Sequence, residues 1–159
     1  MEPIERDAIV RRLGDNVVRD DSDRLSKILM SAFPFAHGVP DWSQALRVVR
    51  RDPPPERSRG ANAGPDSLDS KQYAAQVVEF FSECMAKYGI VDDWVMYVGD
   101  NTEAEYRVRR IAVPMLLDEV ADIPEHKYIF SHDAKWCFGW SFSDELSFGF
   151  RPERRPLSC

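Results

Sequence analysis

The sequence has few cysteines and no long hydrophobic run. Three cysteines occur in 159 residues, in three unlike contexts: Cys84, Cys137 and Cys159. An odd number without close spacing argues against the disulfide framework of a small secreted domain. No apolar run approaches the ~20 residues that span a bilayer, and residues 1–15 carry charges throughout, unlike a secretory signal. We therefore expect a cytoplasmic protein with reduced thiols and no membrane partner.

Motifs for phosphate or metal binding are also missing. Gly60 and Gly64 stand in a proline-rich segment without a following Lys-Ser or Lys-Thr, so they do not indicate a nucleotide-binding loop. The three histidines, His37, His126 and His132, lack the paired spacing of metal ligands. The sequence thus predicts no metal and no cofactor.

Two groups of residues contain the letters of a catalytic site. Ser131, His132 and Asp133 are consecutive, and because a catalytic triad is assembled from distant segments, a polar turn between two strands is the better interpretation. Glu125 and His126 stand beside an acidic segment, and His132 could meet them across a hairpin. A small hydrolase or nuclease with this His/Glu cluster is therefore the alternative to a non-catalytic protein.

Basic charge is not in excess either. The net charge is −6, and residues 67–159 hold 10 basic and 16 acidic side chains. A surface of this sign repels phosphate backbones, which argues against nucleic acid as a partner, and attracts a basic protein. The alternative is a solvated surface that keeps the protein soluble. The carboxylates that we single out as a candidate partner-binding surface are Asp92, Asp93, Asp118, Glu119 and Asp122.

The first half of the chain carries mainly helical patterns. Apolar residues at helical spacing predict helices over residues 3–13, 22–33 and 42–49. Residues 51–66 contain four prolines and two glycines, which predict a loop. A longer helix with an aromatic apolar face is predicted over residues 67–88.

The second half carries strand patterns. Residues 90–101 and 105–114 predict two strands, and residues 115–123 predict a short amphipathic helix. The aromatic run 127–150 is typical of an antiparallel meander of three short strands. In its middle strand, alternation places four aromatic side chains on one face: Trp136, Phe138, Trp140 and Phe142.

Together these patterns predict an α+β fold, with N-terminal helices packed on a C-terminal, mostly antiparallel sheet of about four to five strands. The length suits a single domain over residues 1–159. We expect a helical part (1–50), a Pro/Gly-rich loop (51–66), the long helix and sheet (67–150) and a tail (151–159).

Residues 92–150 resemble the C-terminal part of small bacterial immunity proteins from polymorphic-toxin and contact-dependent growth-inhibition systems. In several of these, an Asp-x-x-Trp-Cys strand, a turn and a last strand close the sheet, and Asp133, Trp136 and Cys137 match that ending. The resemblance implies a non-catalytic toxin inhibitor that binds one cognate toxin domain, often a nuclease. Nucleases are commonly basic, so an acidic inhibitor gains complementarity. An adaptor domain with another partner is the remaining interpretation.

Overall fold

The computed structural model describes residues 7–57, 67–100 and 104–153. Within these ranges the strands form one seven-stranded sheet, in the order β1-β6-β5-β7-β8-β9-β4, and a separate two-stranded hairpin. Neighbouring strands of the large sheet are all antiparallel. The sheet consists of β1 (Val17–Asp20), β4 (Leu46–Arg51), β5 (Trp94–Gly99), β6 (Glu105–Arg109), β7 (Lys127–Phe130), β8 (Trp136–Trp140) and β9 (Leu146–Phe150). The hairpin consists of β2 (Phe35–Ala36) and β3 (Val39–Pro40).

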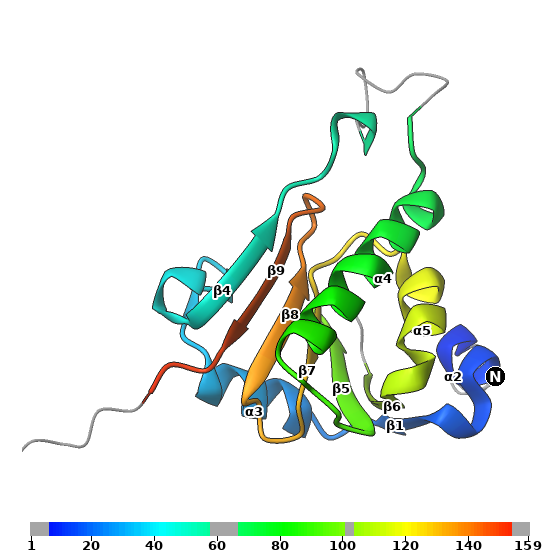
Figure 1. The fold of residues 1–159 in the computed structure, drawn as a ribbon. Helices are drawn as coiled ribbons and strands as arrows, with labels where there is room; N and C mark the ends of the chain where they lie inside the picture. The colour runs from blue at the N-terminus through cyan, green and yellow to red at the C-terminus, as the bar shows by residue number, and fades with distance from the viewer. Residues whose placement is uncertain (1–6, 58–66, 101–103, 154–159) are drawn as a thin grey trace, which may run out of the picture.

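Helices lie on both faces of the sheet (Figure 1). Helices α2 (Ala8–Leu13), α4 (Ser70–Lys87) and α5 (Val113–Val120) cover one face, and α3 (Arg24–Ala32) lies on the other. Short 3₁₀ turns complete the described secondary structure: η1 (Gly14–Asn16), η2 (Trp42–Gln44), η3 (Pro55–Arg57) and η5 (Arg110–Ala112). The fold is α+β with an antiparallel sheet, as the sequence predicts, but the sheet is larger than the predicted four to five strands.

The main core lies between the sheet and helices α2, α4 and α5. The strand register places one row of buried side chains next to each other across the sheet: Tyr106, Tyr97, Ile129, Phe138 and Phe148. Helix α4 packs on this row with its own buried face: Tyr73, Ala74, Val77, Phe80, Phe81, Cys84 and Met85. Each fully buried apolar side chain contributes roughly 1.5–3 kcal/mol, so this layer provides most of the hydrophobic stabilisation.

Helix α4 is the best predicted element. Asp69 accepts a hydrogen bond from the Gln72 backbone N–H, and the Gln72 side chain accepts one from the Asp69 N–H, which together form a capping box. The helix ends at Lys87, and Gly89 follows with a positive φ of 61°. The prediction of a long helix over residues 67–88 is therefore confirmed. The helix begins three residues later than predicted, at Ser70, and ends at Lys87.

The aromatic strand β8 has the two unlike faces that alternation predicts. Trp136, Phe138 and Trp140 are buried in the main core, whereas Phe142 lies beyond the strand and is half exposed. On the opposite face, Gly139 lets the indole of Trp42 approach, because a Cβ at Gly139 would stand 3.0 Å from Trp42 Cζ2. The meander of three strands over residues 127–150 is confirmed.

The predicted strand number is too low, because residues 1–50 are not purely helical. They supply β1 at one edge of the sheet and β4 at the other. The predicted helix over residues 42–49 is wrong. Asp41 caps only the single turn η2, and Arg47 has a positive φ of 52° at an irregularity within β4. Pairing with β9 satisfies the backbone of β4, and this tertiary gain outweighs a weak helical spacing.

Both predicted strands before α5 are shorter than expected. Strand β5 begins only at Trp94 and β6 ends at Arg109, so Val91 and Ile111 lie outside the sheet. Pro114 does not end a strand but stands in the first turn of α5, where its missing N–H costs nothing. The helix predicted over residues 115–123 therefore begins and ends earlier, at Val113 and Val120.

All four parts of the predicted organisation fall partly outside the described residues. Residues 3–6 of the predicted helix 3–13 and residue 101 of the predicted strand 90–101 lie outside them. Of the Pro/Gly-rich loop, residues 58–66 lie outside them, and η3 forms within residues 51–57. Of the tail, residues 154–159 with Cys159 lie outside them. No helix in the described ranges is long and apolar enough to cross a membrane.

Gly99, the last residue of β5, is required by the buried carboxylate of Glu125. A Cβ at Gly99 would overlap with that carboxylate, and Glu125 is only 2% exposed. We expect Gly99→Ala to lower the free energy of unfolding by about 1–3 kcal/mol through overpacking. Urea denaturation measures this loss.

A double-mutant cycle provides the control for Gly99. In a Glu125→Ala background the overlapping side chain is absent, so the added methyl group at Gly99 should cost almost nothing. An equal loss in both backgrounds would show that Glu125 is not the cause.

Candidate functional site

The five acidic residues that the sequence singles out do not form one surface. Asp118 and Glu119 lie on α5, on the face of the sheet that α2 and α4 share. Asp118 accepts a hydrogen bond from Arg12, which lowers its pKa more than any other contact. Lys71 also donates to the Asp118 backbone oxygen at 3.2 Å, and Arg12 lies 3.6 Å from Glu119. This acidic group is therefore largely neutralised within the protein.

The other members of the set lie elsewhere. Asp122 follows α5 and is exposed. Asp92 and Asp93 stand immediately before β5 and line a hollow on the α3 side of the sheet. Asp93 forms an ion pair with Arg109 at 2.8 Å, and no ion pair of the Asp92 side chain occurs among the described residues. Asp92 and Asp122 are thus the predicted site residues whose charge is best available to a partner.

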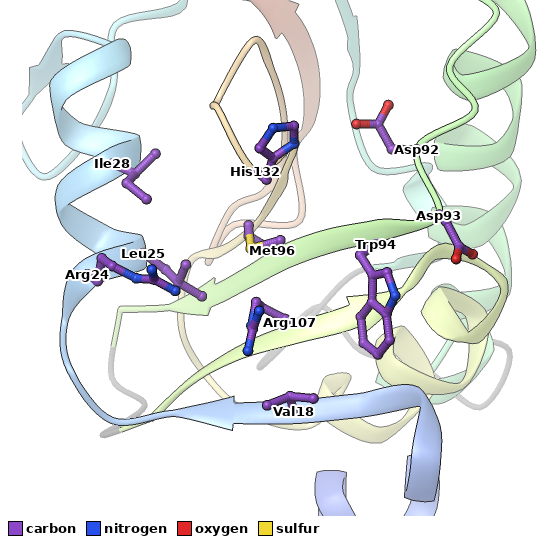
Figure 2. A pocket seen from close by; sticks show the side chains of 10 residues that line it. All are labelled: Val18, Arg24, Leu25, Ile28, Asp92, Asp93, Trp94, Met96, Arg107 and His132. Atoms are coloured by element: carbon purple, nitrogen blue, oxygen red, sulfur yellow. The ribbon is translucent and has the colours of Figure 1, made fainter.

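A hollow lies beside Asp92, and we call it the α3 groove (Figure 2). Its volume is about 610 Å³. The residues that line it come from β1, α3, β5 with the two residues before it, β6 and the turn after β7: Val18, Arg24, Leu25, Ile28, Asp92, Asp93, Trp94, Met96, Arg107 and His132.

The strand register explains why the α3 groove exists. Val18, Arg107 and Met96 are direct neighbours across β1, β6 and β5, on the face that α3 packs against. Helix α3 covers Met96 and the strands beyond it, but not the edge formed by β1 and β6. Val18 therefore stays 42% exposed. The groove is the uncovered part of the sheet between α3 and the edge strand.

A buried carboxylate holds α3 in this position. Asp23, the residue before the helix, has a positive φ of 60° and makes no side-chain cap. Glu105 of β6 takes over that role, because its carboxylate accepts hydrogen bonds from the backbone N–H groups of Leu25 at 2.8 Å and Ser26 at 3.0 Å. The Ser26 hydroxyl donates to the same carboxylate. One wall of the groove is thereby anchored to its floor.

A second hollow lies on the other side of the acidic pair, between the end of α4 and the start of α5. Its volume is about 370 Å³. Its lining is mostly apolar: Phe81, Ser82, Met85, Ala86, Gly89, Ile90, Val91, Arg110, Ile111 and Pro114. Val91 is 79% exposed and Ile111 is 73% exposed, more than any other large hydrophobic residue in the described ranges. We call it the α4–α5 hollow.

Residues 91–94 border both hollows. Val91 lines the α4–α5 hollow, whereas Asp92, Asp93 and Trp94 line the α3 groove. Trp94 also carries the guanidinium of Arg109 over its ring, at 4.7 Å from the centroid. An exposed aliphatic side chain, two carboxylates and an aromatic ring thus follow one another between two hollows, a composition that suits recognition of another protein.

The geometry does not assemble the alternative catalytic cluster. His126 and His132 precede and follow β7, so at about 3.3 Å per residue roughly 20 Å of extended chain separates them. Glu125 is buried beneath Gly99, and His126 Nδ1 accepts a hydrogen bond from the Phe142 N–H. In the described ranges, no three His, Cys, Asp or Glu side chains converge as a metal site.

The Ser131-His132-Asp133 segment is a turn. Ser131 Oγ donates to Asp133 Oδ1 at 2.8 Å, and both side-chain oxygens accept the Lys135 N–H. His132 is exposed, and no hydrogen bond between it and Ser131 or Asp133 is present. These hydrogen bonds order the connection between β7 and β8, as the turn interpretation predicts.

The two described cysteines are buried free thiols. Burial raises the pKa of Cys84 to about 11, and it raises the pKa of Cys137 as well. A thiol acts as a nucleophile only as a thiolate. Neither residue therefore has the environment of a catalytic cysteine.

Comparison with known proteins identifies no relative. No protein-family model matches the chain, and neither a curated protein nor a solved structure matches it.

Sequence reasoning missed the apolar half of this surface. It assigned Val91 and Ile111 to strand interiors, where apolar side chains need no further explanation, and it did not single out Trp94 or Arg107. Gly89 and the Asp-Asp pair next to Val91 carried a signal, because a helix stop followed by two acids indicates that the next strand has not yet begun.

Proposed function

We propose that this protein is a non-catalytic immunity protein that binds and neutralises a cognate toxin domain. The observation that carries the proposal is the surface around residues 91–94, where exposed Val91 and Ile111 adjoin two carboxylates between two hollows. Exposed apolar side chains beside charged ones are typical of protein interfaces. The ending at Asp133, Trp136 and Cys137 that resembles bacterial immunity proteins supports the choice of a toxin as the partner.

The acidic part of the proposed contact is Asp92, with Asp93, the ion-pair partner of Arg109, beside it. A basic toxin, such as a nuclease, would gain encounter rate and specificity from carboxylates next to the apolar contact. Asp118 and Glu119 are less suitable, because Arg12 and Lys71 already compensate them. The binding surface that we propose is therefore narrower than the set predicted from sequence.

Substitution of the two exposed aliphatic residues tests this proposal. The proposal places the gene of the cognate toxin next to the gene of this protein, and the domain encoded there is the one to use. We expect the double variant Val91→Asp, Ile111→Asp to weaken binding by at least about 100-fold, because each aspartate would place an unpaired charge in an apolar contact, at a cost of several kcal/mol. Isothermal titration calorimetry measures the affinity, and growth under toxin expression measures the neutralisation.

Met30→Asp is the matched control. Met30 is 61% exposed, lies on α3 and lines neither hollow, so this variant should bind and protect like the wild type. Alanine at His126 separates the proposal from the hydrolase alternative, because an enzyme would lose activity and an immunity protein keeps its protection. Full protection by the double variant would overturn the proposed surface, and a wild-type protein that neither binds nor protects would overturn the function.

A further inference from the structure

We propose that the α3 groove binds a segment of the partner protein that places a carboxylate on Arg107 and an apolar side chain against Val18 and Trp94. The inference rests on the proposed function. It specifies which side chains the partner places on the α3-groove side of residues 91–94. The groove is a separate contact from the α4–α5 hollow, which Val91 and Ile111 line.

Arg107 lines the α3 groove without a counter-charge among the described residues. Its two arginine neighbours along the chain both have partners: Arg109 pairs with Asp93, and Arg110 Nε donates to the Asp92 backbone oxygen at 2.8 Å. Arg107 is exposed, and no ion pair or hydrogen bond of its guanidinium occurs among the described residues. A guanidinium with five free donors is suited to a carboxylate, which it can bind through two parallel hydrogen bonds.

The surroundings of Arg107 make that charge effective. Val18 and Met96 flank it across the neighbouring strands, and Ile28 of α3 lines the same groove, so apolar side chains border it on these sides (Figure 2). Arg24 also lines the groove, and it forms an ion pair with Asp20 at 3.3 Å. A carboxylate that enters this space loses less through competition with water than on an open surface.

The charges of the groove also set a direction. Arg24 and Arg107 lie toward α3 and β6, whereas Asp92 and Asp93 lie at the start of β5 (Figure 2). A partner segment with its acidic residue toward α3 and its basic residue toward Asp92 is complementary, and the reverse orientation places like charges together. This polarity favours a protein segment, because a polypeptide presents different side chains in a defined order.

The shape agrees with a polypeptide occupant. Pockets for small molecules enclose most of the ligand surface, but this groove is open along β1, where Val18 is 42% exposed. Its volume of about 610 Å³ suits a few side chains of a bound segment. Arg107 is exposed, as expected for a residue that meets a partner at the mouth of a groove.

Short peptides test the inference without the toxin. The probes are acetyl-Leu-Glu-Leu-amide and its variants with Gln or Lys in the middle, titrated into the full-length ¹⁵N-labelled protein. We expect the Glu peptide to shift the amide signals of Val18 and Arg107 and the indole signal of Trp94. We expect it to bind about fivefold more tightly than the Gln peptide, the ratio that a partly exposed ion pair supports, and the Lys peptide to bind most weakly.

The variant Arg107→Met keeps the length of the side chain and removes its charge. In this variant the Glu and Gln peptides should bind equally. Arg50→Met is the control, because Arg50 is an exposed arginine on β4 at the opposite edge of the sheet, and this variant should keep the fivefold preference. Sodium chloride at 0.5 M should reduce the preference in the wild type by screening.

Three outcomes would overturn the inference: no shifts in the groove, equal binding of all three peptides to the wild type, or an unchanged preference in Arg107→Met. An equal response to N-acetylglutamate amide alone would also overturn it, since that result indicates a site for small anions. The double variant at Val91 and Ile111 should keep the peptide response. If toxin binding is lost while the peptide response stays intact, the proposed toxin contact has failed. The proposed peptide contact in the α3 groove has not.

Discussion

Replacement of Asp144 by alanine is expected to lower the free energy of unfolding by about 3–5 kcal/mol, because it leaves a buried guanidinium without its counter-charge. Asp144 and Arg57 have side chains that are 4% and 5% exposed. Arg57 Nε lies 3.1 Å from Asp144 Oδ2, as an ion pair rather than a hydrogen bond. Trp140 Nε1 donates to the other carboxylate oxygen at 2.9 Å.

This ion pair connects segments that are distant in the sequence. Arg57 also donates to the Leu68 backbone oxygen and to Ser70 Oγ, both at 3.0 Å, at the start of α4. Tyr73 of α4 donates its hydroxyl to the Asp144 backbone oxygen at 2.7 Å. These contacts therefore connect three segments: the turn between β8 and β9, the end of the segment after β4, and the first turns of α4. The loss of the ion pair should therefore lower the free energy of global unfolding.

Asp144→Asn is the matched control for the alanine variant. Asp144 has a positive φ of 67°, which asparagine tolerates better than alanine, and an asparagine oxygen can still accept from Trp140. Its stability should fall between those of the wild type and the alanine variant. Urea denaturation with an unchanged m-value provides the comparison. A loss below about 1 kcal/mol for Asp144→Ala would show that the buried pair is not a net contributor.

Glu105→Ala should have the second-largest effect, a loss of about 2–4 kcal/mol. The carboxylate satisfies the buried N–H of Leu25 and the N–H of Ser26, and an unsatisfied buried donor costs about 1–3 kcal/mol. Because α3 forms one wall of the α3 groove, the change should also loosen that wall. In this variant, hydrogen exchange at the amides of Leu25 and Ser26 should accelerate relative to the wild type, and it should accelerate more than at the amides of α4.

Glu105→Gln distinguishes the hydrogen bonds from the filling of space. Glutamine has nearly the same volume, but its single oxygen cannot replace both carboxylate oxygens, so this variant should lose part of the stability. If Glu105→Gln and Glu105→Ala lowered the free energy of unfolding equally, the second carboxylate oxygen of Glu105 would account for the whole stabilisation. If glutamine were as stable as the wild type and α3 amides exchanged at the wild-type rate, the capping role of Glu105 would be wrong.

Elements whose stability is local could be predicted from the sequence. Helix α4 has its cap at Asp69, its apolar face and its stop at Gly89 within one continuous stretch, so local pattern and final structure agree. The three strands of residues 127–150 are similar, because alternation and polar turns such as Ser131–Asp133 lie next to each other in the chain. The buried row Trp136, Phe138 and Trp140 followed directly from this alternation.

Elements whose stability comes from distant partners could not. Strand β4 carries a helical spacing, and only pairing with β9, about a hundred residues away, makes it a strand. Strand β1 likewise depends on β6. The ends of β5 and β6 were misjudged for the same reason, since the exposure of Val91 and Ile111 depends on where their neighbours in space end.

The sequence by itself determined the class of the fold, the long helix, the aromatic core strand and the acidity of the C-terminal half, because these follow from periodicity and composition. Only the tertiary structure decided which charges remain available, because Arg12 and Lys71 neutralise Asp118 while Asp92 has no such partner. The same holds for the α3 groove. Its floor, its wall and Arg107 come from four separate segments, and no local pattern records the distance between them.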